Sequence, residues 1–306
     1  MSARVTAVVL NWNGLDDTLH CISSLKALAY EDLSILVVDN GSELSPRERL
    51  EREHSQVRVV ENARNLGYSG GNNVGIASAM DDGAEFVWVL NNDTVVDPGS
   101  LDELLDTAKR HPRAAAVGGK VLYVDPADRI WVTWGRVTWL QSLIALVGEG
   151  KKDHRRYDVE RAVPWIPGCS LLLRSAAVVE LGGFDENFFA YHEDVEWAER
   201  ARRRGWELWY NGRARVHHAV HGSSGGAASY TGFRKYLSAR NSVLFARRYG
   251  RPWHWALMAV AIALTLPFQF LRRALRGEGG AVGLKLRGWL DGLRDSEIPF
   301  SELGLR

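Results

Sequence analysis

The chain of 306 residues has few cysteines and almost no net charge, and each shortage excludes a class of protein. Its two cysteines, Cys21 and Cys169, provide neither a disulfide framework nor the paired spacing of a structural zinc site, so a reducing compartment is expected. A net charge of +1 gives no general attraction to nucleic acid. Residues 1–6 lack the layout of a signal peptide. The sequence therefore predicts a globular, cytoplasmic protein that does not bind nucleic acid.

Short apolar runs alternate with helical patterns through the first half of the chain. The hydrophobic share of 46% and the charged share of 25% are ordinary for a globular protein. Buried strands are expected over residues 5–12, 33–39, 57–60, 85–90 and 114–123, and amphipathic helices over 15–28 and 101–110. This alternation predicts an α/β fold with a doubly wound, mostly parallel sheet.

The run from Glu85 to Asp93 gives the first indication of a site. Its apolar residues lead directly into Asn91, Asn92 and Asp93. A buried strand with this ending places oxygen atoms at the carboxyl edge of the sheet, where open α/β sheets bind ligands. A carboxylate with amide neighbours suits a hard divalent cation that takes its other ligands from water and phosphate. An ordinary Asn/Asp turn after a strand is the alternative.

Two further strand ends carry polar residues. Asp39 follows the second strand, where an acid can accept hydrogen bonds from a base or a ribose, and a turn acid is the alternative. Residues 65–75 form a glycine-rich loop that opens a helix over 76–80. The N-terminus of that helix could hold an anion, and a flexible connector is the alternative. The loop matches neither the P-loop nor the dinucleotide fingerprint.

Four motifs stand along these strand ends, at residues 11–14, 37–42, 65–73 and 90–93. They read Asn-Trp-Asn-Gly, Val-Val-Asp-Asn-Gly-Ser, Asn-Leu-Gly-Tyr-Ser-Gly-Gly-Asn-Asn and Leu-Asn-Asn-Asp. In order and spacing they resemble family 2 glycosyltransferases, especially the bacterial rhamnosyltransferase-like branch. The resemblance implies a GT-A fold, a Rossmann-like doubly wound mostly parallel sheet with an acceptor-side half and C-terminal helices. The expected parts are a glycosyltransferase domain over 1–225, with a nucleotide-binding half to about 123, and a helical region over 226–306.

The resemblance also assigns roles to individual residues. Contact with the nucleotide sugar is expected from Asn11, Asn13, Asp39, Asn40, Asn65, Gly67, Asn72, Asn73, Asn92 and Arg240. A divalent metal, Mg²⁺ or Mn²⁺, is expected on Asp93, and His218 and His221 are candidates to complete its ligands. Asn91 stands where the family commonly has a first acid, which makes Asp93 the main ligand. The alternatives are a solvated histidine cluster and a capping role for Arg240.

A second acidic stretch follows the aromatic residues Phe188, Phe189 and Tyr191. Glu193 and Asp194 begin an expected helix, where the positive end of the helix dipole favours them. Neighbouring apolar side chains raise the pKa of a carboxyl group and can bring it into the range suited to general base catalysis. The resemblance makes Asp194 the catalytic base for the acceptor hydroxyl, and Glu193 a supporting residue or acceptor contact. A helix with acids at its start and arginines at its end is the alternative.

Two regions beyond these motifs have several interpretations. Residues 124–165 are rich in tryptophan, which suits an acceptor groove, a mobile lid or an ordinary core. Residues 252–271 contain no charged side chain and have arginines on both sides. The run is long enough to span a bilayer, but its arginines lack the positive-inside asymmetry. A helix in the membrane interface is favoured, and a buried helix or a homodimer face are the alternatives.

The sequence therefore predicts an inverting, metal-dependent glycosyltransferase, in which Asp93 and Asp194 must open onto one cleft. A sugar would pass from a dTDP- or UDP-linked donor to a hydroxyl of a glycan or lipid-linked acceptor, at the inner face of the cell membrane if the apolar helix binds there. Rhamnose is the commonest sugar of the resembled branch. A sugar-nucleotide pyrophosphorylase would carry a basic glycine loop after the first strand, which residues 11–14 lack. A non-catalytic nucleotide-sugar-binding protein is the other alternative.

Overall fold

The computed structural model of the protein divides into two compact units. It describes residues 2–140, 143–220, 233–275, 280–294 and 296–303. The first unit comprises Met1–Gly135, Leu146–Phe189 and Glu193–Ser223, and the second comprises Arg136–Ala145, Ala190–His192 and Ser224–Arg306. The domain boundary predicted at residue 225 falls outside the described residues.

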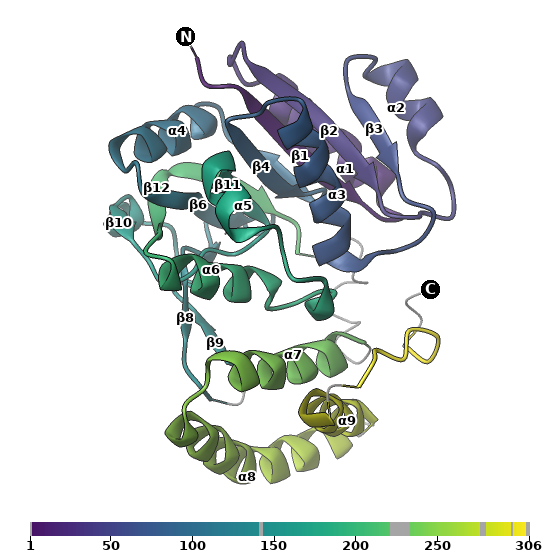
Figure 1. The fold of residues 1–306 in the computed structure, drawn as a ribbon, viewed down its shortest axis with the longest axis vertical. Coiled ribbons are helices and arrows are strands. Elements are labelled where there is room, and N and C mark those ends of the chain that lie inside the picture. Colours follow the sequence, from purple (N-terminus) through teal and green to yellow (C-terminus); the bar gives the residue numbers. More distant parts are fainter. Residues whose placement is uncertain (1, 141–142, 221–232, 276–279, 295, 304–306) are drawn as a thin grey trace. The chain divides into compact units, whose positions relative to one another are not determined.

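A mixed ten-stranded sheet forms the centre of the first unit (Figure 1). Its strands are β1 Val5–Asn11, β2 Leu33–Asp39, β3 Arg58–Glu61, β4 Phe86–Asn91, β5 Thr94–Val96, β6 Ala114–Tyr123, β7 Ile130–Val132, β10 Glu160–Ala162, β11 Ser170–Arg174 and β12 Glu207–His218. Their order is β10-β12-β6-β11-β4-β1-β2-β3, with β5 beside β12 and β7 beside β6. β1 pairs in parallel with β2 and β4, whereas β11 runs antiparallel between β4 and β6. The predicted α/β class is confirmed.

Helices cover both faces of this sheet, as a doubly wound fold requires. They are α1 Leu15–Lys26, α2 Arg47–Glu53, α3 Gly67–Asp81, α4 Ser100–Arg110, α5 Ser175–Leu181 and α6 Glu193–Arg203, with single 3₁₀ turns at Arg155–Tyr157 and Glu186–Phe188. Side chains of α1 and α4 share one core with Val5, Ala7 and Val9 of β1. α3 lies on the opposite face, against Val8. Successive residues of β1 are therefore buried on alternate faces of the sheet.

The glycine-rich stretch is helix rather than loop, and the predicted helix start at Ile76 is wrong. α3 begins at Gly67. A Cβ atom on Gly75 would stand 2.3 Å from Val8 Cγ1, and one on Gly71 would stand 2.6 Å from Leu10 Cδ1. These glycines therefore let the helix approach β1 closely, and they are not a sign of a loose connector. The close approach sets the N-terminal turns of α3 beside the carboxyl end of β1.

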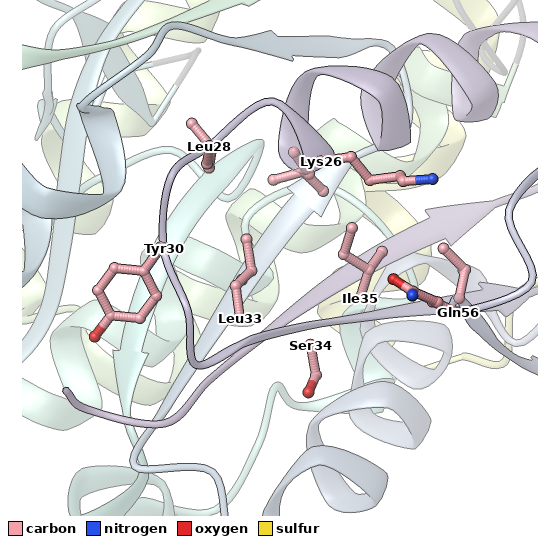
Figure 2. A pocket seen from close by; sticks show the side chains of 9 residues that line it. Lys26, Leu28, Tyr30, Leu33, Ser34, Ile35 and Gln56 are labelled. Carbon is pink, nitrogen blue, oxygen red and sulfur yellow. The ribbon is translucent and has the colours of Figure 1, made fainter. Parts of the chain in front are cut away.

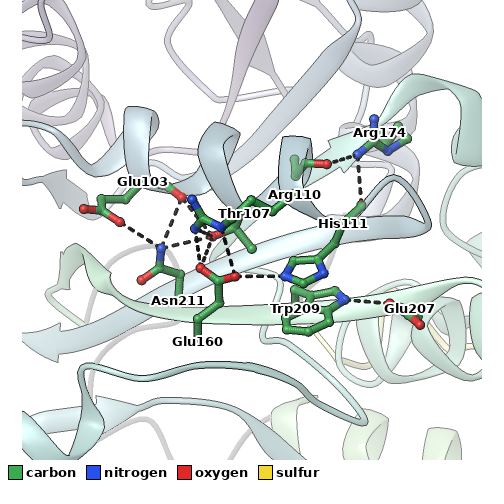
Figure 3. Close-up of polar contacts among 10 residues, drawn as sticks. Glu103, Thr107, Arg110, His111, Glu160, Arg174, Glu207, Trp209 and Asn211 are labelled. Carbon is green, nitrogen blue, oxygen red and sulfur yellow. Dashed lines mark hydrogen bonds and ion pairs between the residues drawn. The ribbon is translucent and has the colours of Figure 1, made fainter.

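Ion pairs hold residues 148–162 to the sheet and to the end of α4. Lys120 on β6 is fully buried, and its Nζ donates to Asp153 Oδ1 at 2.7 Å and also to Asp158. Glu160 on β10 bonds Arg110 and His111 at the end of α4 (Figure 3). These bonds attach Asp153, Asp158 and Glu160 to β6 and to the end of α4. Lid motion in the predicted 124–165 region stays a prediction.

Among its described residues, the second unit contains three helices and most of a short hairpin. They are α7 Phe233–Tyr249, α8 Pro252–Ala274 and α9 Gly280–Arg294, with the hairpin strands β8 Gly135–Val137 and β9 Ile144–Leu146. A Cβ atom on Gly288 would stand 2.3 Å from the Tyr236 carbonyl oxygen, and one on Gly292 would stand 2.6 Å from the Arg240 oxygen. The two glycines therefore allow α9 to pack closely along α7. The helix predicted over residues 252–271 is confirmed as α8.

Candidate active site

The ends of two strands bring a carboxylate and an imidazole together. Asp93 Oδ1 lies 2.9 Å from His218 Nε2, and each side chain is only 7% exposed. His218 ends β12, which pairs antiparallel with β5 immediately after Asp93. Trp131 of β7 meets the His218 ring edge-on, with ring centroids 4.7 Å apart. The structure thus joins two of the three predicted metal ligands, and the third, His221, lies outside the described residues.

Asn91 adds a polar group to this pair, and the three residues fit a divalent ion. Asn91 Nδ2 lies 3.3 Å from His218 Nε2, and Asn91 Oδ1 is buried without a hydrogen-bond partner in the described part of the chain. Two ligands of an octahedral ion, each at about 2.1 Å, stand about 3 Å apart, close to the separation of Asp93 Oδ1 and His218 Nε2. Within the described ranges, no three Cys, His, Asp or Glu side chains could hold a metal together. A diphosphate and water would have to supply the other ligands.

Asp194 lies at the start of α6, beside the residues that lead into β11. Its Oδ2 accepts a hydrogen bond of 2.8 Å from the Gly168 N–H, and its Oδ1 accepts one of 2.8 Å from the Val195 N–H. Each oxygen keeps a further lone pair that can take a proton. Burial raises the pKa of Asp194 to about 6, although these two N–H groups act to lower it. Such a carboxylate is ionised at neutral pH and is still basic enough to accept a proton.

Burial also favours the protonated form of the neighbouring acid, Glu193. Its side chain is buried, and Oε2 has no hydrogen-bond partner among the described residues. Burial, and then the charge of Asp194, raise the pKa of Glu193 well above its usual range. The protonated form is therefore favoured more strongly at Glu193 than at Asp194, as in sites that keep two carboxyls in different states.

Gly168 and Cys169 join the two acids into one site. The Gly168 N–H donates to Asp194, and the Cys169 carbonyl accepts a bond of 3.0 Å from the Asn91 N–H. Asn91 ends β4 two residues before Asp93, so a bridge of two residues separates the two acidic segments. Burial raises the pKa of the Cys169 thiol, and the charges of Asp93 and Asp194 raise it further. Both acids therefore lie near the same end of β11, and a cleft onto which both open stays a prediction.

The chain enters α6 through a strained turn. Phe189, Tyr191 and His192 have φ angles of 58°, 70° and 70°, which side-chain-bearing residues seldom adopt. In the second unit, Asn241 Nδ2 donates to the carbonyl oxygens of Ala190 and Tyr191 at 2.8 and 2.7 Å. Strain of this kind persists only where the surroundings hold it, and it is common at functional sites. Asn241 is therefore a positioning residue for the turn.

The predicted nucleotide contacts at the ends of β1 and β2 bond one another. Asn11 Nδ2 donates to Asp39 Oδ1 at 2.7 Å, and the Ser42 N–H donates to Asp39 Oδ2 at 3.1 Å. Asn13 has a φ of 54°, and its Oδ1 accepts a bond of 2.9 Å from the Glu43 N–H. These bonds shape the carboxyl edge of the sheet. Direct contact of the three residues with a nucleotide stays a prediction.

A second group of amides holds the N-terminal turn of α3. Asn40 Nδ2 donates to Asn65 Oδ1 at 2.9 Å and to the Gly67 carbonyl at 3.0 Å. Asn73 Nδ2 donates to the Phe184 carbonyl at 2.8 Å, which ties α3 to the segment before α6. The predicted residues therefore lie together, although their polar groups already bond protein atoms.

Asn72 and Asn92 complete the predicted set in the first unit. Asn92 Nδ2 donates to the Gly14 carbonyl at 3.0 Å, so this side chain fixes the start of α1. Asn72 Nδ2 donates to the Tyr68 carbonyl at 2.9 Å, whereas its buried Oδ1 has no partner in the ranges that the structure describes. Asn72 is therefore more available than Asn92 for contact with a ligand, because an unpartnered amide oxygen can accept a hydrogen bond.

Arg240, the last predicted contact, belongs to the second unit. It is buried, and its Nη2 donates to the Ser296 carbonyl at 3.1 Å while its Nη1 lies 3.2 Å from Asn241 Oδ1. These bonds favour the capping alternative, and contact with the nucleotide sugar stays a prediction.

A separate hollow of about 270 Å³ lies where β2 begins (Figure 2). Leu28, Leu33 and Ile35 supply apolar lining, and Lys26 and Gln56 supply polar groups. Ligands of open α/β sheets bind at the carboxyl ends of strands, and this hollow is at an amino end. It is therefore not part of the candidate site.

Known proteins with similar sequences are glycosyltransferases. The model of a family described as glycosyl transferase family 2 matches residues 6–177. An N-acetylglucosaminyl-diphospho-decaprenol L-rhamnosyltransferase from Mycobacterium tuberculosis is 32% identical over 237 residues, which cover 68% of this chain and 74% of that protein. A low-salt glycan biosynthesis hexosyltransferase, Agl10, from Haloferax volcanii is 25% identical over 244 residues, which cover 78% of this chain and 74% of that protein.

Solved glycosyltransferases share the fold. The mannosyltransferase PcManGT from Pyrobaculum calidifontis, in complex with GDP-Man and Mn²⁺, has a TM-score of 0.60 at 17% identity and covers 97% of this chain and 89% of its own. GalNAc-T7, with UDP, GalNAc and Mn²⁺, has a TM-score of 0.63 at 14% identity and covers 80% of this chain and 48% of its own. The predicted GT-A fold is confirmed.

Proposed function

This chain belongs to glycosyl transferase family 2 and is a glycosyltransferase, and on that premise we propose that it is an inverting, metal-dependent enzyme whose base is Asp194. The observation that carries the proposal is the bridge of Gly168 and Cys169, which has Asp194 on one side and the Asn91–Asp93 segment on the other. Membership of the family excludes the pyrophosphorylase and the non-catalytic binding protein as alternatives.

The protonation states of the two adjacent acids support base catalysis by Asp194. Its ionised carboxylate takes the proton of an acceptor hydroxyl while two backbone N–H groups hold both oxygens in place. The hydroxyl oxygen then bonds to the anomeric carbon as the bond from that carbon to the diphosphate breaks, which inverts the anomeric configuration. Burial favours the protonated form of Glu193, which adds no second negative charge beside the base.

Asp93, His218 and Asn91 would hold the metal. Their spacing, and the unpartnered oxygen of Asn91 within the described structure, support this assignment. A divalent ion bound there would offset the negative charge of the leaving diphosphate.

The nature of the relatives supports the choice of substrates. The Mycobacterium tuberculosis relative is named as a rhamnosyltransferase that acts on a diphospho-decaprenol lipid. By analogy the donor of this chain is a dTDP- or UDP-linked sugar, with rhamnose the first choice, and the acceptor is a sugar hydroxyl of a lipid-linked glycan. A polyprenyl acceptor places the enzyme at the inner face of the cell membrane, in polysaccharide or cell-wall synthesis.

The test is release of nucleoside diphosphate from a panel of dTDP- and UDP-sugars, with and without a polyprenyl-diphosphate-GlcNAc acceptor. Release that depends on acceptor, stops with EDTA and returns with Mn²⁺ is expected. Proton NMR of the product should show the anomeric configuration opposite to that of the donor. Retained configuration, or full transfer by a folded Asp194→Asn variant, would contradict the proposal.

A further inference from the structure

One helix of the second unit exposes a continuous apolar stripe. The stripe residues of α8 are Trp253, Leu257, Val260, Leu264, Phe268, Leu271 and Leu275, with Leu275 just past the end of the helix. They recur every three or four positions, so they share one side of the helix. Leu264 is 75% exposed and Phe268 is 68% exposed. Large apolar side chains gathered at this density mark an interaction surface.

The opposite side of α8 is already in use. Met258 is buried, and Trp255, Ile262 and Leu266 pack against a core of α7 and α9 side chains, namely Ala239, Val243 and Trp289. The stripe therefore faces away from the core of its own unit. The helix meets the length and composition of a membrane span over Pro252–Arg272, and only 11% of its most apolar 18-residue window is buried.

The residues beside the stripe favour lipid over a second copy of the chain. Helices that pair in water carry charged residues along the edges of their apolar seam. The edge positions Ala256, Ala259 and Ala263 are exposed and small, and no residue from 252 to 271 is charged. The apolar surface of α8 is therefore wider than the narrow seam of a helix pair, and no charged residue borders it between 252 and 271. A wide apolar surface of this kind is typical of a helix that lies in lipid.

The charge of the surrounding segment is complementary to anionic lipid. Residues 233–294 hold twelve arginines and lysines against two acids, a net charge of +10, while the whole chain has +1. Exposed arginines stand at both ends of the stripe, with Arg248 and Arg251 before it and Arg272 at its far end. Basic groups at the edge of an apolar surface bind the headgroups of anionic phospholipids.

The packing of α8 against α9 favours a helix that lies on the bilayer over one that spans it. At 1.5 Å per residue its 23 residues extend about 34 Å, which is enough to span. However, Lys285 Nζ of α9 donates to Gln269 Oε1 of α8 at 3.3 Å, and Trp289 of α9 packs on α8 as well. A spanning α8 would draw the charged side of α9 into hydrocarbon, which is costly.

We propose that the stripe of α8 docks the enzyme on an anionic bilayer, with the helix parallel to the membrane plane and its arginines at the headgroups. This goes beyond the proposed sugar transfer, and it does not depend on the donor, the metal or the base. It gives the enzyme a route to an acceptor that is itself held in the membrane.

Vesicle sedimentation of the full chain, without donor or acceptor, tests the proposal. The wild type should bind vesicles of phosphatidylcholine with one-third phosphatidylglycerol, and bind pure phosphatidylcholine far less. Leu264→Glu with Phe268→Glu should weaken binding by about tenfold or more, since both side chains would leave lipid. Arg272→Gln should weaken it by about fivefold and reduce its salt dependence. Val179→Glu, at a 74% exposed apolar position of α5, is the matched control and should bind as wild type.

Three outcomes would overturn the proposal. Sedimentation of the double glutamate variant with vesicles at the wild-type level would place the contact elsewhere. Resistance of the wild type to extraction by alkaline carbonate would indicate a spanning helix. A dimer in sedimentation velocity that the double variant dissociates, without vesicle binding by the wild type, would assign the stripe to a second copy. Leu264→Ser repeats the test if the glutamate variant does not fold.

Discussion

Two polar clusters of the first unit differ in the direction in which their surroundings shift the carboxyl pKa. Around Glu160, every side chain finds a partner (Figure 3): the carboxylate accepts bonds from Arg110, from His111 at 2.8 Å and from Thr107 at 3.1 Å. The His111 ring stacks on Trp209 with centroids 3.3 Å apart. The Arg110 guanidinium lowers the pKa of Glu160 to about 2, with His111 and Thr107 contributing.

At the Asp194 site the polar groups are incompletely paired. Glu193 Oε2 and His218 Nδ1 are buried and have no hydrogen-bond partner in the described ranges. Burial raises the pKa of Glu193 and of Asp194, whereas ion pairing lowers that of Glu160. A dense hydrogen-bond network alone therefore does not identify a functional site. Raised carboxyl pKa values and buried polar atoms without a hydrogen-bond partner are better indicators of a functional site. A ligand needs polar atoms that are available to bind it, and proton transfer needs a carboxylate of raised pKa.

The largest effect should come from Asp194→Asn. A positioned general base contributes about 10³-fold to rate, and the amide cannot accept the proton, so kcat should fall by that order while the protein still folds. Glu193→Gln is the matched control. It replaces a neutral acid with a neutral amide of the same shape, so kcat should stay within about tenfold of wild type. Equal losses in the two variants would contradict the division between base and neutral acid.

Asp93→Asn should rank next. Loss of the main metal ligand should lower kcat/KM by about 10²-fold and raise the Mn²⁺ concentration needed for half-maximal rate. The same strands carry an adjacent control pair, Asp97 and His217, with Asp97 Oδ1 3.2 Å from His217 Nε2. Asp97→Asn should change kcat/KM by about twofold or less. If it were as damaging as Asp93→Asn, the metal assignment would lose its basis.

The pH dependence of kcat/KM should report the ionisation of Asp194 and not that of Glu160. Asp194 must be ionised to act, so kcat/KM should fall about tenfold per pH unit below its pKa of about 6 and level off above it. The profile is measured with saturating Mn²⁺ and repeated with Glu160→Gln, which should leave it unchanged. A midpoint near the ordinary value of an aspartic acid, 3.8, would show that burial does not tune this group.

The smallest effect should be that of Glu160→Gln, and it should fall on stability alone. The change weakens charge-assisted bonds, so the free energy of unfolding should drop by about 1 kcal/mol near neutral pH, with kcat unaffected. Because the folded pKa is lowered from 4.5 to about 2, the stabilisation is complete above 4.5 and lost as the pH falls through 2. Thermal melts of the two proteins should therefore converge in that window. A gap that persists at pH 2 would contradict the ion-pair account.

Sequence patterns alone located most of the elements and the polar strand ends. Asp39 and Asp93 follow short apolar runs. In the structure Asp39 is the last residue of β2, and Asp93 lies two residues beyond the end of β4. The helix start at Gly67 was missed because glycine has low helix propensity. That propensity is overridden by contact with β1, where Gly75 leaves room for Val8.

The amino-acid sequence by itself determined the α/β class, the family, the two acids and the uncharged run of α8, because these depend on local periodicity and on motifs in order. Only the tertiary structure decided which groups meet. His218 reaches Asn91, 127 residues away, through the pairing of β12 with β5, and Gly168 links Asp194 to the end of β4. The raised pKa values also belong to the fold, since they arise from burial, which depends on what packs around a residue and not on its neighbours in the chain.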